Sequence, residues 1–404
     1  MGIALRHREL SFSPVVHQER PSGMQKLIDY ENSLVEKHSK PDTTPYTLED
    51  KKYIQQRESQ FATTARAHTV LEILMQEMVE AMNWLSVTDK TEQGTRVIET
   101  FVHPASRYDD IANGVDAVME WKTSDGTIHY MGFDITAAGS NKVIDKKLDK
   151  IVEHIQGGEL GTIKYFTTSE FDKDIQQPKQ LHNIPIVIIG IDQDRLDIIR
   201  QSIAKKTEAL GAKTPTKALN AVFGNQEYRL GMLEAIKNQL YYQFIALLDA
   251  WLNQYEFPDD IAHLTEKQQN LIDEIAKVYY TDDLSIPPMT HQDVETLINA
   301  FHRLGVSLDD FKAIVASTTP LQQSPTQIVH KGNIRSFTRT KETVQTTPTY
   351  YESLWNVLKA IELTESATKD AVLKLNSKLV TPHSALAKIP MPPPLKNISY
   401  KKVA

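Results

Sequence analysis

Two aspartates, Asp116 and Asp134, stand inside otherwise apolar stretches of the sequence. A buried carboxylate is unfavourable unless it accepts hydrogen bonds, pairs with a cation or binds a metal. Two carboxylates that face each other form an oxygen-rich site suited to Mg²⁺, or to Mn²⁺ in its place. Such a site supports phosphodiester hydrolysis, because the metal activates water and stabilises the leaving oxygen. A nearby lysine would add positive charge for the transition state.

The spacing of the two aspartates predicts that they meet across a β-hairpin. Residues 114–121 and 128–136 are predicted strands, and Asp125-Gly126 between them is a strong turn signal. In a hairpin centred on Asp125, Asp116 lies opposite Asp134 and both side chains share one face of the sheet. A strict two-residue turn would shift the register by one and separate them. The hypothesis therefore requires a loop with an odd number of residues, or a bulge at Gly126.

The sequence around this hairpin predicts an α/β unit over residues 47–206. Thr47 can cap the first helix with Asp50 three residues later, and Gly157-Gly158 can end the second. The predicted elements are, in order, a helix at 47–85, strands at 96–102, 114–121 and 128–136, a helix at 140–156, and strands at 162–167 and 184–191. This αβββαβ order indicates an α/β (α+β) core.

The rest of the chain divides by composition. Residues 1–46 are a polar segment with a short helix at 23–37, residues 207–316 are helical, residues 317–349 are a Ser/Thr-rich basic linker, and residues 350–404 combine a helix at 350–379 with a Pro-rich tail. Within the helical region the predicted helices are 227–256, 265–279, 290–304 and 307–315. The C-terminal region is thus expected to be mostly α-helical.

Composition narrows the classes of function. The chain has 404 residues, 40% hydrophobic and 24% charged, which is ordinary for a protein with a core. Cysteine is absent, so disulfides, thiolate zinc sites and a cysteine nucleophile are excluded, and a reducing compartment is favoured. No apolar run reaches the ~18–20 residues of a membrane span. We therefore expect a cytoplasmic protein without a membrane segment. The net charge of -7 means that any nucleic-acid binding must use a local basic surface.

The element order and the two aspartates resemble the PD-(D/E)XK nuclease superfamily. Its core is a helix, three strands, a helix and a strand, with an acid on the first helix, an Asp on the second strand and an acid-x-Lys on the third. Asp116 matches the second-strand Asp and Asp134 the third-strand acid, but Thr136 stands where the lysine belongs. Some members carry that lysine on the following helix. The resemblance implies a restriction-endonuclease-like fold and an Mg²⁺-dependent endonuclease or exonuclease, acting on DNA more than RNA.

Helical geometry selects the remaining candidates. Among the lysines of the 140–156 helix, Lys147 lies at the border of the apolar face, whereas Lys146 points to solvent and Lys142 lies in the first turn. Lys147 is therefore the candidate catalytic lysine. The same test on the first helix selects Glu77 as its acid. The predicted site thus consists of Asp116 and Asp134 as metal ligands, with Lys147 and Glu77 beside them.

Each candidate has a structural alternative. Asp116 could order the Asn113-Gly114 turn, and Asp134 could form a structural salt bridge with a lysine of the next helix. Lys147 could be a solvated lysine that covers apolar neighbours, and Glu77 a surface acid. Further candidates, each with a structural alternative, are Asp109, Asp110 and Glu120.

For the whole chain, the alternative to a nuclease is a catalytically inactive nuclease-like fold that binds nucleic acid or protein. A third possibility is a structural or regulatory helical protein. If nucleic acid binds, a positive groove is expected, with Lys142, Lys146, Lys147, Lys164, Lys331, Arg335, Arg339 and Lys341 as its contributors. His129 is expected to be structural, because it faces the other side of the sheet from Asp134.

Overall fold

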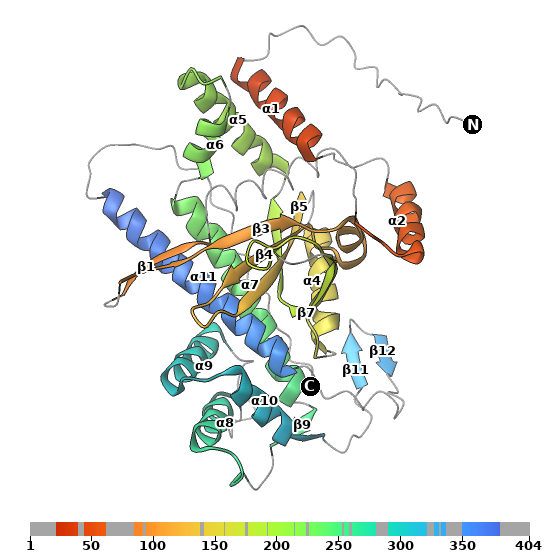
Figure 1. The fold of residues 1–404 in the computed structure, drawn as a ribbon, viewed down its shortest axis with the longest axis vertical. Helices are drawn as coiled ribbons and strands as arrows, with labels where there is room; N and C mark the ends of the chain where they lie inside the picture. Colours follow the sequence, from red (N-terminus) through yellow and green to blue (C-terminus); the bar gives the residue numbers. More distant parts are fainter. Residues whose placement is uncertain are drawn as a thin grey trace.

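A computed structural model gives the fold as a mixed α/β region followed by helices (Figure 1). The structure describes residues 22–38, 44–61, 85–91, 94–137, 141–156, 158–173, 177–191, 193–213, 215–223, 226–252, 254–257, 261–279, 290–320, 327–330, 333–336 and 350–379. Most of the predicted helix at 47–85 lies outside these ranges, since α2 (Leu48–Phe61) is its described part.

A four-stranded mixed sheet positions the candidate site. Its strands, in spatial order, are β3 (Thr100–Pro104), β4 (Ala117–Lys122), β5 (Ile128–Ala137) and β8 (Ile186–Ile191). The first two pairings are antiparallel and the third is parallel. Parallel neighbours need a crossover connection, and α4 (Asn141–Gln156) lies in the segment that joins β5 to β8.

The β4–β5 hairpin has the predicted register. Ala117 pairs with Phe133, so extending the ladder by one residue places Asp116 opposite Asp134. The loop 123–127 has the odd length that this register requires. Gly126 has a φ of 89°, a left-handed conformation that glycine adopts without a steric penalty. The predicted pairing of the two strands is thereby confirmed.

Two parts of the α/β region differ from the prediction. The predicted strand at 96–102 is divided at the exposed Glu99: β2 (Gly94–Ile98) pairs with β1 (Val87–Thr91), and only β3 enters the sheet. The strand predicted at 162–167 also lies outside the sheet, because β6 (Gly161–Phe166) pairs with β7 (Lys179–Ile184), which was not predicted. The nearly continuous apolar run of β8 suits the position beside β5, where a parallel strand is buried on both faces.

Different elements cover the two faces of the sheet. Helices α7 (Gln226–Leu252) and α11 (Tyr350–Leu379) lie side by side and share an apolar cluster with Met119, Trp121 and Phe133. The opposite face packs on the β6–β7 hairpin in a second cluster: Val115, Val118, Ile163, Phe166, Leu181, Ile184 and Ile186. Side chains alternate along a strand, so Asp116 and Asp134 belong to this second face.

The outer edge of β8 is closed by glutamines of α7. Gln239 accepts the N–H of Ile188 at 2.7 Å and donates to the carbonyl of the same residue at 2.8 Å. One turn further along, Gln243 donates to the carbonyl of Ile186 at 2.7 Å. These amides pair the outward backbone groups of Ile188 and the carbonyl of Ile186, where a neighbouring strand would otherwise lie.

The remaining elements are α1 (Ser22–His38), η1 (Asp109–Asn113), α5 (Gln193–Ala209), α6 (Thr216–Phe223), α8 (Glu266–Tyr279), α9 (His291–Leu304), α10 (Leu308–Ser317), and the strand pairs β9 (Tyr255–Glu256) with β10 (Thr319–Pro320) and β11 (Gln327–His330) with β12 (Asn333–Ser336). Among them, α1, α8, α9 and α10 lie close to their predicted ranges, whereas η1 and the strand pairs were not predicted, and β11 and β12 lie in the segment predicted as a linker. Ser307 caps α10 by accepting the N–H of Asp310 at 3.4 Å. Within the described ranges, no helix has both the length and the apolar character to cross a membrane.

Candidate active site

Asp134 and Lys147 form the centre of the candidate site. Asp134, on β5, is only 6% exposed. The ammonium of Lys147, on α4, forms an ion pair with Oδ1 of Asp134, and the lysine side chain keeps 30% of its surface exposed. The neighbouring Lys146 is exposed. The predicted approach of a helix lysine to Asp134 is thus confirmed, whereas a catalytic function for either residue remains a proposal, because a structural ion pair would have the same geometry.

Asp116 lies directly before β4 and extends its ladder. Its Oδ2 accepts the backbone N–H of Ile135 at 2.6 Å, and its own N–H donates to the carbonyl of Phe133 at 2.8 Å. Ile135 lies beyond the last β5 residue that pairs with β4, so the carboxylate takes the place of a strand partner for this N–H. The hydrogen bond fixes the orientation of the Asp116 carboxylate beside β5.

A third carboxylate, that of Asp110, comes from the short π-helical turn η1. It lies within hydrogen-bonding reach of Asp116, and its charge also acts on Asp134. Gly114 ends the turn with a φ of 68°, and a Cβ atom at this position would lie 3.6 Å from Oδ2 of Asp134. Turns of π-helix are frequent at functional sites. The sequence made Asp109 and Asp110 equal candidates, and the turn places only Asp110 beside the two predicted ligands.

The environment of Asp110 and Asp134 raises the pKa of both carboxyl groups. Burial raises the pKa of Asp134 above its usual value, and the charge of Asp110 adds to this, although Lys147 opposes it. Burial also raises the pKa of Asp110, against the opposing effects of Arg107, Lys147 and the hydrogen bond with Asp116. A cation placed between the carboxylates would lower these pKa values, because it favours the charged forms.

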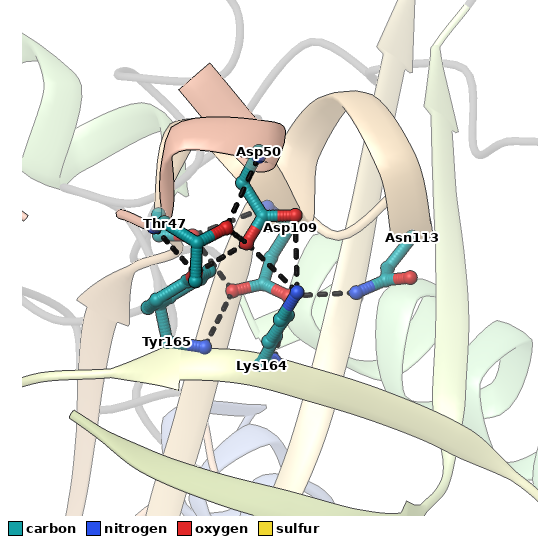
Figure 2. A network of polar contacts seen from close by, with 7 residues as sticks. Thr47, Asp50, Asp109, Asn113, Lys164 and Tyr165 are labelled. Carbon is teal, nitrogen blue, oxygen red and sulfur yellow. Dashed lines mark hydrogen bonds and ion pairs between the residues drawn. The ribbon is translucent and has the colours of Figure 1, made fainter. Parts of the chain in front are cut away.

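Asp109 has structural partners for both of its oxygens (Figure 2). Its side chain is fully buried. Oδ1 accepts the amide of Asn113 and the backbone N–H of Lys164, both at 2.7 Å, and Oδ2 accepts the hydroxyl of Ser106 at 2.7 Å and the backbone N–H of Tyr165 at 3.0 Å. The carboxylate therefore ties η1 to β6, and the structural alternative describes it best.

A second network in the same region attaches α2 (Figure 2). Thr47 and Asp50 form the predicted cap. The Thr47 hydroxyl donates to the Asp50 carboxylate at 2.7 Å and accepts the backbone N–H of Asp50 at 3.2 Å. The ammonium of Lys164 lies 2.8 Å from Asp50, whose Oδ2 also accepts the hydroxyl of Tyr165. Although burial acts in the opposite direction, the bonds from Lys164, Tyr165 and Thr47 hold the pKa of Asp50 below its usual value. Lys164, expected in a positive groove, is instead paired with Asp50.

Glu120 also has a structural environment. It is fully buried, and its carboxylate lies 2.9 Å from Nε2 of His103 and accepts the hydroxyl of Ser169 at 2.6 Å and the N–H of Glu170 at 2.5 Å. Although burial raises it, these hydrogen bonds hold the pKa of Glu120 below its usual value. Glu120 therefore anchors the segment after β6 to the sheet and does not join the candidate site.

His129 is buried on the face of the sheet opposite Asp134, as the sequence predicted, and its environment favours the neutral form. Its ring stacks on Trp121 with centroids 5.5 Å apart, and burial and the charge of Lys359 lower its pKa to about 4 from the ordinary 6.5. In the unfolded chain the histidine binds a proton below pH 6.5, while the folded protein binds it only near pH 4. Stability should therefore fall as the pH drops through this window, by about 3 kcal/mol in total.

Urea unfolding of the parent and of His129→Gln at neutral pH and near pH 4.5 tests this expectation. The variant should lose about 2–3 kcal/mol less than the parent between the two conditions. Equal losses in both proteins would show that His129 titrates normally in the folded state.

Several predicted contributors lie outside the described residues or side chains: Glu77, Lys142, Lys331, Arg335, Arg339 and Lys341. Among the described side chains, no group of three or more His, Asp or Glu is arranged to hold a metal ion. The donors of the cluster nevertheless fit a hard divalent cation in type, since Asp110, Asp116 and Asp134 all offer carboxylate oxygens. A cation at Asp134 would have to displace the ammonium of Lys147.

No family model, curated protein or solved structure matches this chain.

Proposed function

We propose that this protein is a metal-dependent nuclease that hydrolyses phosphodiester bonds at the cluster of Asp110, Asp116, Asp134 and Lys147. The contact between Lys147 and Asp134 carries the proposal. Lys147 lies on the helix that follows β5, and it could replace the lysine that the nuclease motif would place at position 136, where this chain has Thr136. The strand order β3-β4-β5-β8, with its parallel last pair, is also compatible with the layout of the PD-(D/E)XK nucleases.

The side chains of the cluster have distinct tasks in this proposal. A Mg²⁺ or Mn²⁺ ion, when bound, would activate water and polarise the phosphate. Asp116, oriented by the N–H of Ile135, and Asp134 would hold the ion. Lys147, released from Asp134, would place its positive charge beside the phosphate, where negative charge develops. Asp110, within hydrogen-bonding reach of Asp116, would add a third carboxylate beside the ion.

Nucleic acid is the partner that this chemistry requires, and DNA is the first substrate to test. Lys146 and Lys150 are exposed on α4, and the side chain of Arg107 is 48% exposed next to Asp110. Phosphates could be held by these cations around the carboxylates. We place the reaction in the cytoplasm, since the lack of cysteine fits a reducing compartment.

The second candidate function is a nuclease-like module that binds nucleic acid or protein without cleaving it. The position of Lys147 favours it, because the ammonium neutralises the carboxylate that would have to bind a metal. Asp116 is likewise engaged by the N–H of Ile135.

Substitutions of two neighbouring lysines on α4 can distinguish the nuclease from the inactive binding module. Lys147→Ala should reduce cleavage of labelled single- and double-stranded DNA and RNA at least about 100-fold in Mg²⁺ or Mn²⁺, because it removes a charge beside the reacting phosphate. Lys146→Ala, which removes an exposed lysine that could contribute to phosphate binding but does not contact Asp134, should retain the cleavage rate at saturating nucleic acid.

Metal titration of the parent, followed by its melting temperature, completes the test. Cleavage by neither the parent nor the variants, with retained binding, would support the inactive module. Undetectable binding of every nucleic acid at low salt would exclude both functions.

A further inference from the structure

Next to the carboxylate cluster, α2 and η1 carry a pair of partly exposed tyrosines. Tyr53 on α2 and Tyr108 at the start of η1 have ring centroids 6.0 Å apart. Each ring has a cation over it: the guanidinium of Arg57 lies 5.4 Å from the centroid of Tyr53, and the ammonium of Lys164 lies 4.7 Å from that of Tyr108. Arg57 is exposed.

This surface adjoins the candidate site through Arg107. Its guanidinium bonds Glu58 of α2 at 2.9 Å and forms an ion pair with Asp110. Tyr108 is the next residue in the chain, two positions before Asp110. A strand of nucleic acid with a phosphate at the carboxylates could therefore bring a neighbouring base to the tyrosine pair.

Both tyrosines keep part of their surface exposed, although the ring of Tyr108 also packs edge-on against Tyr165 with centroids 5.6 Å apart. Between residues 48 and 59 of α2, only Asp50 and Ile54 are buried, so the helix has a narrow contact with the rest of the protein. Its attachment is largely polar, through the Asp50 network and the Glu58–Arg107 pair. Partly exposed aromatic rings beside cations are typical of sites that bind single-stranded nucleic acid. The bases can stack on the rings, and the cations can bind the phosphates.

We propose that Tyr53 and Tyr108 form a base-stacking platform that makes single-stranded nucleic acid the preferred substrate class. This inference rests on the proposed nuclease function and names its substrate. Arg57 occupies the position over Tyr53 that a base would take, and a displaced Arg57 could bind the adjoining phosphate. The bases of an intact duplex are already stacked on each other and cannot use the platform.

Fluorescence anisotropy in the presence of EDTA can measure this preference without cleavage. The probes are a labelled single strand of deoxyadenosine, a fully abasic strand of equal length and charge, and the corresponding duplex. The parent should bind the base-containing strand roughly tenfold more tightly than the abasic strand, the effect expected when a base stacks on an aromatic ring. The duplex should bind like the abasic strand.

Variants of the two tyrosines identify the platform. Tyr53→Leu and Tyr108→Leu should each reduce the preference for bases over abasic sites severalfold, whereas Tyr53→Phe and Tyr108→Phe, which keep the ring, should retain it. Tyr351→Leu, a partly exposed tyrosine on α11, is the matched control and should bind like the parent. If the tyrosines only held α2 in place, the leucine variants would melt at a lower temperature without changing the preference, which would overturn the inference.

The outcomes also separate this inference from the nuclease proposal. Equal binding of base-containing and abasic strands by the parent, together with cleavage in Mg²⁺ or Mn²⁺, would refute the platform and leave the nuclease. A base preference that depends on the tyrosines, without cleavage in any metal, would support the platform and refute the nuclease.

Discussion

Replacing Asp134 by asparagine should abolish metal-dependent cleavage and leave the protein folded. The substitution keeps the shape of the side chain but removes the charge that would hold a divalent cation, and both water activation and leaving-group stabilisation depend on that cation. Burial raises the pKa of Asp134, so the charged form is the unfavourable one in the folded state. A pKa above the unfolded value means that stability from this group is present at low pH and is lost as the pH rises through the folded-state pKa.

The ion pair with Lys147 decides how much stability the asparagine variant loses. Breaking a fully buried pair would cost ~3–5 kcal/mol, because it would strand a charge. The Lys147 side chain is 30% exposed and can turn to water, so we expect a change within about 1 kcal/mol at neutral pH. Glu153→Gln, an exposed substitution on the same helix as Lys147, controls for loss of a negative charge and should change neither cleavage nor stability.

Melting temperatures with and without Mn²⁺, and cleavage of a labelled single strand, distinguish the two interpretations of Asp134. A variant that melts far below a parent that itself shows neither metal stabilisation nor cleavage would make Asp134 a structural residue. The nuclease proposal would then be wrong.

Periodicity made the hairpin and the lysine predictable. The two-residue repeat of strands and the Asp125-Gly126 turn determine which residues of the hairpin meet, and the pairing of Ala117 with Phe133 follows from them. The helical repeat likewise distinguishes Lys147 from Lys146, because one lies at the border of the apolar face and the other points away. Both inferences use neighbours within a single element or a single hairpin.

Contacts between distant segments were not predictable in this way. Asp50 was expected only as part of a helix cap, and its ion pair with Lys164 joins residues 114 positions apart. Similarly, no local pattern indicates that β6 pairs with β7 while β8 takes the position next to β5. Such choices depend on the total burial of each strand and on which loops can close, and a short window of sequence does not contain that information.

The adjacent residues Asp109 and Asp110 should respond oppositely to the same substitution. Asp109→Asn should lower the free energy of unfolding by ~3–5 kcal/mol, because the residue is fully buried and both of its oxygens accept hydrogen bonds. One oxygen accepts the amide of Asn113 and the N–H of Lys164, and the other accepts the N–H of Tyr165. Either orientation of the asparagine amide therefore sets its NH₂ group against a backbone donor.

Asp110→Asn is the matched variant, since it makes the same chemical change one residue further along. Asp110 is partly exposed, its pKa is raised by burial, and its ion pair with Arg107 is near the surface, so the loss of its charge should cost at most about 1 kcal/mol. Its cleavage activity should nevertheless fall, because a carboxylate beside the proposed metal ion is lost. Urea denaturation and cleavage assays on both variants provide the comparison. A stable but inactive Asp109→Asn variant and an unstable Asp110→Asn variant would contradict this assignment. Asp110 would then be the structural residue, and Asp109 would be the one required for cleavage.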